Sequence, residues 1–137
     1  MTPRGIRNNN PLNIRKGNKW FGERNPQTDP VFEEFESIEM GLRAALILVR
    51  NYINGTTASR VRYNTISAII RKWAPPTENA TQRYIDFVAS KVQTPKDLQI
   101  SFKNKPLIIR LVQAMAFVEC GQWIDIDIIS SAYDLTL

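Results

Sequence analysis

The chain has 137 residues, of which 43% are hydrophobic and 23% charged, and it carries a formal net charge of +5. This length and composition are typical of one globular domain, so we expect a single domain over residues 1–137 and no membrane span. Histidine is absent, which excludes histidine-dependent triads, histidine-ligated zinc and histidine general bases, and leaves acid–base chemistry to carboxylates.

The charge and the single cysteine bear on partners and compartment. A net charge of +5 predicts an anionic partner, which can be nucleic acid, a membrane surface or the bacterial cell wall. Cys120 has no second cysteine for an internal disulfide, and we expect neither a metal ion nor a cofactor. The start "MTPRGIRNNNP" has no apolar core segment, so we expect synthesis in the cytoplasm without a secretory signal.

Residues 1–36 are rich in turn-forming residues and show little helical periodicity. The stretches "NNNP", "GNKWFGE" and "NPQTDP" favour turns, and they flank two short segments that can form strands, at residues 12–15 and 31–35. We therefore expect a small N-terminal β-hairpin or loop region.

Two helices are predicted next along the chain. Ser37 can cap a helix that extends to about Ile53, in which apolar residues recur at helical spacing. Thr65 can cap a second helix, which Pro75 and Pro76 end because proline lacks a backbone donor and restricts the residue before it.

Two further helices complete the prediction. Asn79 with Gln82 is a weak match to a capping box, and the helix that follows has the apolar stripe Tyr84, Ile85, Val88 and Val92. The last helix extends from about Leu107 to Glu119. The sequence therefore predicts a mainly α-helical domain with a small β-containing start.

Glu119 ends this last helix, in the stretch "AFVECG". Residues 107–118 are apolar almost all round, with Arg110 and Gln113 as their polar members, which is typical of a helix buried at the centre of a domain. At about 100° per residue, Glu119 lies on the apolar side, where burial would raise its pKa as a general acid requires. Gly121 would leave room for a substrate. The alternative is a solvated residue at a helix end.

Two ordered patterns resemble a known family. The residues "RGIRNNNPLNIR", "W.G", "F..F.S" and "GLRAA", followed by "TI..IIRKWAPPTEN.T..YI..V", are similar to the phage and prophage lysozyme-like virion proteins from Arg4 to about Val92. The first pattern is also similar, more loosely, to flagellar-rod type peptidoglycan glucosaminidases. The resemblance implies a lysozyme-like α+β fold, phage or prophage origin, and degradation of peptidoglycan by a muramidase or lytic transglycosylase.

The end of the chain extends the resemblance in a different order. "IIRLVQAMAFVECG" resembles the lysozyme-type helix that ends in Glu-Ser-Gly, with Glu119, Cys120 and Gly121 in these places. The glucosaminidases carry their catalytic glutamate before the asparagine motif, where this chain has no acidic residue. We therefore infer a circularly permuted order, in which the N-terminal loop meets the end of the last helix in space.

The resemblance implies that Glu119 is the catalytic acid on the glycosidic bond. Glu78 in "WAPPTEN" is the rival, although a place in the first turn of a helix favours a lower pKa and a capping role. A hydrolase needs a second carboxylate, for which Asp29, Glu34, Glu36 and Glu78 are candidates. A lytic transglycosylase needs one glutamate, because a hydroxyl of the substrate attacks instead.

Five residues are candidates for substrate binding. Asn8, Asn9 and Asn10 offer amide groups to N-acetyl and hydroxyl groups, while Trp20 and Tyr84 can stack on sugar rings. Each has a structural alternative, because asparagines form turns and both aromatic residues can belong to the core.

Two other classes of function stay open. "NTISAIIRKWAPPTENATQRYIDFV" can form a helix-turn-helix in which Arg71, Lys72 and Arg83 face the phosphates of a nucleic acid. The second alternative is a virion structural protein that keeps the fold without the activity, because fold does not imply function. We expect peptidoglycan glycan strands as the main partner, other virion proteins as further partners, and action at the bacterial cell wall.

Overall fold

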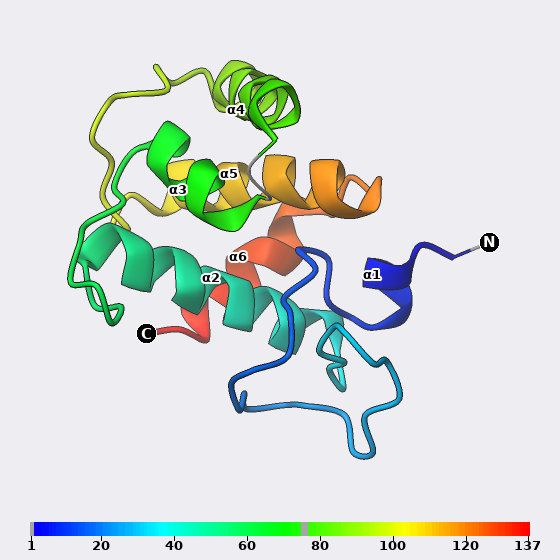
Figure 1. The fold of residues 1–137 in the computed structure, drawn as a ribbon. Coiled ribbons are helices and arrows are strands. Elements are labelled where there is room, and N and C mark those ends of the chain that lie inside the picture. The colour runs from blue at the N-terminus through cyan, green and yellow to red at the C-terminus, as the bar shows by residue number, and fades with distance from the viewer. Residues whose placement is uncertain (1, 75–76) are drawn as a thin grey trace.

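The computed structural model describes residues 2–74 and 77–137, without the side chains of residues 78 and 79. Six helices form within this part of the chain, and α5 lies between α4 on one side and α2 and α6 on the other (Figure 1). The helices are α1 (Arg4–Arg7), α2 (Ile38–Asn54), α3 (Ile66–Trp73), α4 (Glu78–Val92), α5 (Lys105–Cys120) and α6 (Ile126–Asp134). The chain is therefore mainly α-helical, as predicted.

Capping residues place α2, α3 and α5 near their predicted positions. Ser37 Oγ accepts a hydrogen bond from the Met40 amide at 3.2 Å, and Thr65 Oγ1 accepts one from the Ala68 amide at 3.1 Å. At the end of α5, Gly121 has a φ of 75°, which glycine adopts without strain. Local side-chain chemistry therefore sets where these helices begin and end.

The sequence analysis missed two helices, the single-turn α1 in the N-terminal segment and the longer α6. Asp125 caps α6 by accepting a hydrogen bond from the Asp127 amide at 2.8 Å. Its buried residues are Ile129, Ala132 and Tyr133, which lie at helical spacing. The helix packs against both α2 and α5 and so closes the core opposite α4.

The N-terminal region, predicted as a small β-hairpin or loop, is a loop with little β-pairing. Within the described residues the only β-pairing consists of two isolated antiparallel bridges, between Arg15 and Phe32 and between Glu23 and Phe35. The first bridge joins the two segments that were expected to form strands. No ladder extends from it, because side-chain hydrogen bonds satisfy much of the backbone here, as described below.

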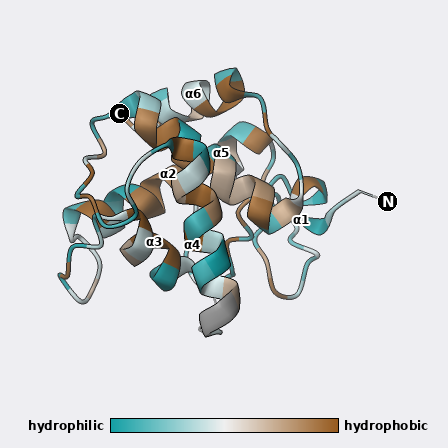
Figure 2. Cartoon of the chain, turned by 90° about the horizontal axis from the view of Figure 1, so that it is seen from above, coloured by the Kyte–Doolittle hydropathy of each residue, from teal (hydrophilic) through white to brown (hydrophobic). Residues whose placement is uncertain are grey.

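The core is built around α5, which is buried along most of its length, as its apolar sequence predicted. Its buried residues are Leu107, Ile108, Leu111, Val112, Ala114, Met115, Ala116 and Cys120. The outer helices α3 and α4 carry both hydrophilic and hydrophobic residues, as expected for helices with one buried face (Figure 2). Over residues 2–74 and 77–137, no helix has the length and apolar character needed to cross a membrane.

Candidate active site

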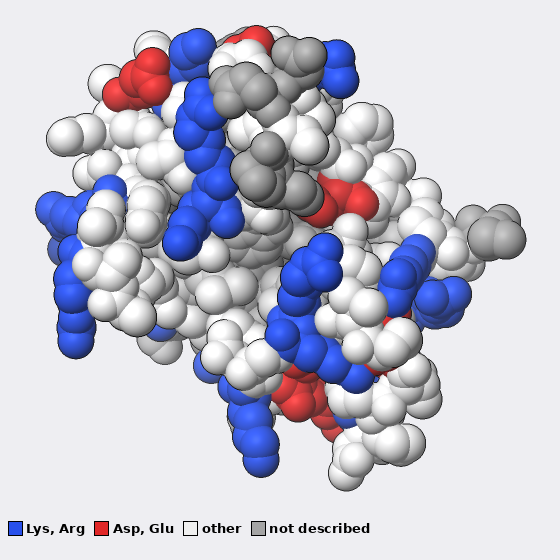
Figure 3. Space-filling model, viewed as in Figure 1, with Lys and Arg blue, Asp and Glu red and all other residues white. Residues whose placement is uncertain are grey.

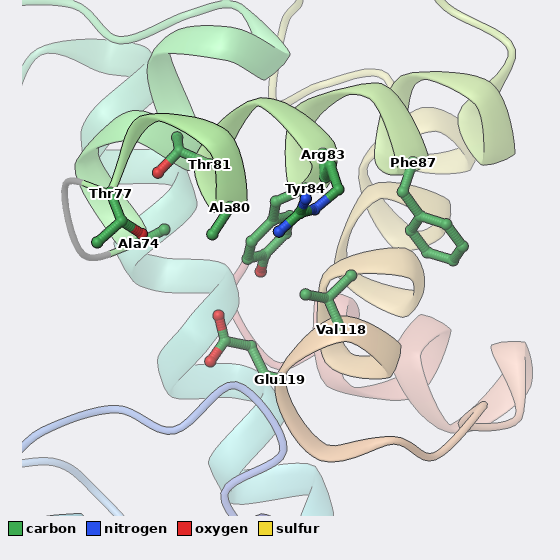
Figure 4. Close-up of a pocket in the computed structure, with 9 residues that line it drawn as sticks. All are labelled: Ala74, Thr77, Ala80, Thr81, Arg83, Tyr84, Phe87, Val118 and Glu119. Carbon is green, nitrogen blue, oxygen red and sulfur yellow. The ribbon is translucent and has the colours of Figure 1, made fainter.

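Glu119 lies in the last turn of α5, at a cavity of about 460 Å³ between α4 and the end of α5 (Figure 4). The residues that line the cavity are Ala74, Thr77, Ala80, Thr81, Arg83, Tyr84, Phe87, Val118 and Glu119. Glu119 is the only carboxylate among these lining residues. The cavity is therefore a mostly apolar pocket with one acidic group, the usual composition of a small-molecule site.

Burial raises the pKa of Glu119 above its ordinary value of 4.5. Hydrogen bonds from the side chains of Tyr84 and Asn13 stabilise the carboxylate and lower the pKa, but their effect is smaller than that of burial. The Tyr84 hydroxyl points towards the Glu119 carboxyl in Figure 4. Glu119 thus holds its proton at a higher pH than an exposed glutamate, as a general acid must.

Asn13 joins the N-terminal loop to the end of α5. Its amide nitrogen donates to the Glu119 carbonyl oxygen at 3.1 Å and approaches Glu119 Oε1 at 3.5 Å. A Cβ on Gly5 would lie 3.1 Å from Cys120 Cβ, so α1 also packs closely on this end of α5. The N-terminal segment and the end of α5 therefore meet, which the permuted chain order requires. The sequence analysis did not single out Asn13.

Asn8, Asn9 and Asn10 lie away from the cavity, with side chains that hold the N-terminal loop together. Asn8 Nδ2 donates to Asp29 at 2.9 Å, and Asn9 Nδ2 donates to the Phe35 carbonyl oxygen at 3.0 Å. Asn8 is buried, and Asn9 has a φ of 53°, in the left-handed region. These contacts correspond to the structural alternative rather than to contact with substrate.

Asn10 makes three such contacts and is fully buried. Its Nδ2 donates to the carbonyl oxygens of Ile14 and Glu33, both at 3.0 Å, and its Oδ1 accepts from the Ile14 amide at 2.9 Å. These bonds take the place of a strand ladder between the two segments. Both amide hydrogens are therefore used within the loop, and the group is fully buried, so the Asn10 side chain does not face a ligand in this conformation.

Two of the proposed second carboxylates are held in ion pairs. Asp29 receives two hydrogen bonds from Arg4, both at 2.6 Å, and these, together with bonds from nearby backbone amides and Asn8, hold its pKa far below the ordinary range against the effect of burial. Glu34 is buried too, but hydrogen bonds from Asp29, Thr28 and Arg24 outweigh that burial and lower its pKa. Both carboxylates therefore stabilise the loop as anions.

The remaining candidates for a second carboxylate are Glu36 and Glu78. Glu36 is exposed. Glu78 is the first residue of α4, but its side chain lies outside the described residues. Glu33, which the sequence analysis did not consider, is buried, and desolvation and the neighbouring Glu23 raise its pKa to about 7. Within the described residues, no group of three or more cysteine and acidic residues could hold a metal ion.

The two aromatic candidates are placed differently. Tyr84 is largely buried, forms one wall of the cavity, and donates from its hydroxyl to the Met115 carbonyl oxygen at 3.4 Å. Trp20 is partly buried against the core and does not line the cavity. Its Nε1 is buried and has no hydrogen-bond partner within the described part of the chain. The structure therefore brings together Glu119 and Tyr84, but not Trp20.

A second, more polar cavity of about 250 Å³ lies on the other side of Asn13. Its lining includes Asn13, Arg15, Lys72 and Trp73, and the Trp73 Nε1 donates to the Leu12 carbonyl oxygen at 3.1 Å. Figure 3 shows lysine and arginine side chains on both sides of a hollow in this face of the molecule. Asn13 lines this cavity and contacts Glu119, which lines the first, so the walls of the two cavities are linked by this contact.

The helix-turn-helix alternative gains little from the positions of its basic residues. Arg83, which was expected to face phosphates, lines the cavity that contains Glu119 (Figure 4). Arg71 lies within 3.4 Å of Gln82 on the next helix, and Lys72 faces the polar cavity. The three residues therefore do not form one stripe along a recognition helix.

Comparison with known proteins gives one relative. No family model matches the chain. The chain is 40% identical over 122 residues to Protein P5 of Pseudoalteromonas phage PM2, a match that covers 86% of this chain and 71% of that protein.

Proposed function

We propose that this chain, which belongs to the family of Protein P5 of Pseudoalteromonas phage PM2, cleaves the glycan strands of peptidoglycan. Membership of this family supports phage or prophage origin. The observation that carries the proposal is the position of Glu119, partly withdrawn from water at a cavity where the N-terminal loop meets α5. Burial raises the pKa of Glu119, so this carboxyl group holds its proton to higher pH than an exposed glutamate and can protonate the oxygen of a departing sugar.

The proposed fold is lysozyme-like with a permuted chain order. In this chain the glutamate-bearing helix comes last. The asparagine-rich segment, which follows the catalytic glutamate in the flagellar-rod type glucosaminidases, comes first. The contact between Asn13 and Glu119 supports this order, since it joins the two ends of the sequence pattern at the acid. The proposed site of action is the bacterial cell wall, reached by a protein carried in or released with a phage particle.

The surroundings of Glu119 favour the transglycosylase route over hydrolysis. Glu119 is the only described carboxylate at its cavity, while Asp29 and Glu34 are neutralised by arginines. In this route Glu119 first gives its proton to the leaving oxygen, and as a carboxylate it then takes the proton of the substrate hydroxyl that attacks the anomeric carbon. The product is an anhydro sugar, and no water is consumed.

The test is lysis of purified sacculi by the wild type and by Glu119→Gln, followed as loss of turbidity and by zymogram. Loss of a general acid costs about 10²–10⁴-fold in rate, so Glu119→Gln should clear at least about 100-fold more slowly. Asp97→Asn is the matched control, since it removes an exposed carboxylate that is not a candidate for the site, and Glu78→Gln tests the rival acid. Equal clearing by Glu119→Gln and the wild type would refute the assignment.

Two further readouts separate the alternatives. The mass of the soluble products decides the route, since anhydro ends lack one water relative to hydrolysed ends. Absence of lysis in all variants, with the protein present in virions, would instead support a structural virion protein. Binding to generic DNA that weakens steeply with salt would support the nucleic-acid binder.

A further inference from the structure

Three aromatic side chains gather on the surface beside the Glu119 cavity, and we refer to Phe87, Phe117 and Trp123 as the aromatic ledge. The rings of Phe87 and Phe117 are stacked with centroids 5.7 Å apart, and Trp123 meets Phe117 edge to face at 5.2 Å. Phe117 is 39% exposed and Trp123 50% exposed. Aromatic rings usually drive burial, so rings left this exposed in an ordered cluster point to a ligand.

The aromatic ledge continues the cavity that contains Glu119. Phe87 lines that cavity and also a neighbouring cavity of about 350 Å³, whose other walls are Lys91, Phe117 and Trp123. Val118, between Phe117 and Glu119 in the sequence, lines the Glu119 cavity and is 40% exposed. A polymer bound at Glu119 and leaving the cavity past Phe87 would therefore pass over the ledge.

The loop that carries Trp123 is held in place without a ligand. The Gln113 side chain donates to the Ile124 carbonyl oxygen at 2.7 Å, and Ile124 itself is buried. Trp123 therefore stands between two anchored points, the end of α5 and Ile124. Such preorganisation lowers the entropic cost of binding a ligand on the indole ring.

We propose that the aromatic ledge is an outer subsite for the glycan strand, in which sugar rings stack on Trp123 and Phe117. The proposal rests on the function proposed above and extends it. It states that the preferred substrate is a glycan strand long enough to reach from the Glu119 cavity to the aromatic ledge. A sugar ring exposes C–H groups on its faces and polar groups at its edge, so it can cover an aromatic ring while its edge stays in water.

Charge and size also favour a glycan strand over a protein at this surface. The Lys91 ammonium group lies 5.6 Å from the centre of the Phe87 ring and can pair with a carboxylate carried by the wall polymer. A stable protein interface covers about 800 Å² on each partner, and three partly exposed rings supply only roughly a third of that area.

The experiment measures binding of soluble β-1,4-linked N-acetylglucosamine oligomers, the dimer and the hexamer, by calorimetry. It uses Glu119→Gln as the background so that no cleavage occurs. Adding Trp123→Ala or Phe117→Ala should weaken hexamer binding about tenfold and dimer binding less than twofold, because only the hexamer reaches the ledge. Trp123→Phe keeps a ring and should restore most of the affinity. Phe21→Ala is the matched control, since Phe21 is 75% exposed and belongs to none of the described cavities near Glu119.

The outcomes distinguish this proposal from the function on which it rests. Hexamer affinity that is unchanged in Trp123→Ala, in a protein whose wild type clears sacculi, would overturn the ledge and leave the glycosidase standing. Hexamer binding that depends on Trp123, with no clearing by the wild type, would leave a glycan-binding ledge and overturn the enzyme. A dimer in sedimentation that Trp123→Ala dissociates would identify a second copy as the occupant and overturn the ledge as a sugar subsite.

Discussion

Gly41→Ala tests how the N-terminal loop is held against α2. Gly41 is buried in the first turn of α2, where an added Cβ would lie 1.8 Å from the Asn9 carbonyl oxygen and 2.9 Å from its carbon. Ordinary contact begins at 3.4 Å, so the first overlap is about 1.6 Å (3.4 minus 1.8). The Asn9 backbone cannot easily retreat, because the Asn9 side chain is bonded to Phe35 and its φ is 53°.

The expected loss of stability follows from this overlap. Overpacking a rigid site costs about 1–3 kcal/mol and sometimes more, and contact with backbone belongs at the upper end. Alanine gains about 1 kcal/mol of helix propensity over glycine, which offsets part of the loss. We therefore expect Gly41→Ala to lower the free energy of unfolding by about 2–3 kcal/mol, equivalent to a fall in Tm of roughly 10 °C.

Urea unfolding followed by circular dichroism measures this loss, with Gly121→Ala as the control. No atom lies within 4 Å of the Cβ that Gly121 would acquire, so the control carries only the strain of a left-handed φ, about 1 kcal/mol. If Gly41→Ala is as stable as the wild type, or loses no more than Gly121→Ala, the close approach of Asn9 to α2 is not what fixes the loop.

Three further predictions concern protons. Asn13→Ala removes a hydrogen bond that lowers the pKa of Glu119. The alkaline limb of the pH profile of sacculus clearing should therefore move to higher pH, by less than about one unit. An alkaline limb that does not move would contradict the role of Asn13. Glu33 has a folded-state pKa of about 7, above its ordinary value, so its contribution to stability is full below about pH 4 and is lost as pH rises through 7. At pH 8, Glu33→Gln should therefore unfold at a higher urea concentration than the wild type, because its free energy of unfolding is larger by about 1–2 kcal/mol. At pH 4 the two proteins should not differ. At pH 8, Glu119→Gln should also be more stable than the wild type, although it loses activity. A loss of stability at pH 8 would show that burial does not disfavour the ionised form of Glu119.

Local sequence signals were sufficient for most of the helices. Capping residues define helix ends through short-range chemistry, so α2, α3, α4 and α5 lie within about two residues of their predicted bounds. Pro75 and Pro76, which were predicted to end α3, lie outside the described residues. Helix α6 was missed because residues 124–128 alternate between apolar and polar, a period that resembles a strand and masks the helix. The capping Asp125 and the spacing of Ile129, Ala132 and Tyr133 were the signals that could have revealed it.

The candidate site was partly predictable for the same reason. Helical phase placed Glu119 on the apolar side of α5, and burial does raise its pKa. The partners of Glu119 were not predictable, because Asn13 reaches it from 106 residues away through an irregular loop. The same irregular loop explains why Asn8 and Asn10, which were predicted to bind substrate, hold the loop together instead. Without a strand ladder, buried backbone groups need side-chain partners, and short amides next to turns supply them.

Two glutamates in this protein show how environment decides function. Glu34 is buried and Glu119 is partly buried, and this loss of contact with water alone would raise the pKa of each. Glu34 gains an arginine and several hydrogen-bond donors, so its pKa falls and it remains an anion. Among the described residues no ion pair reaches Glu119, and its two side-chain hydrogen bonds only partly offset burial. An arginine engineered next to Glu119 would therefore lower the pKa of Glu119 and favour its ionised form, so that Glu119 could no longer serve as a proton donor even if the cavity kept its shape.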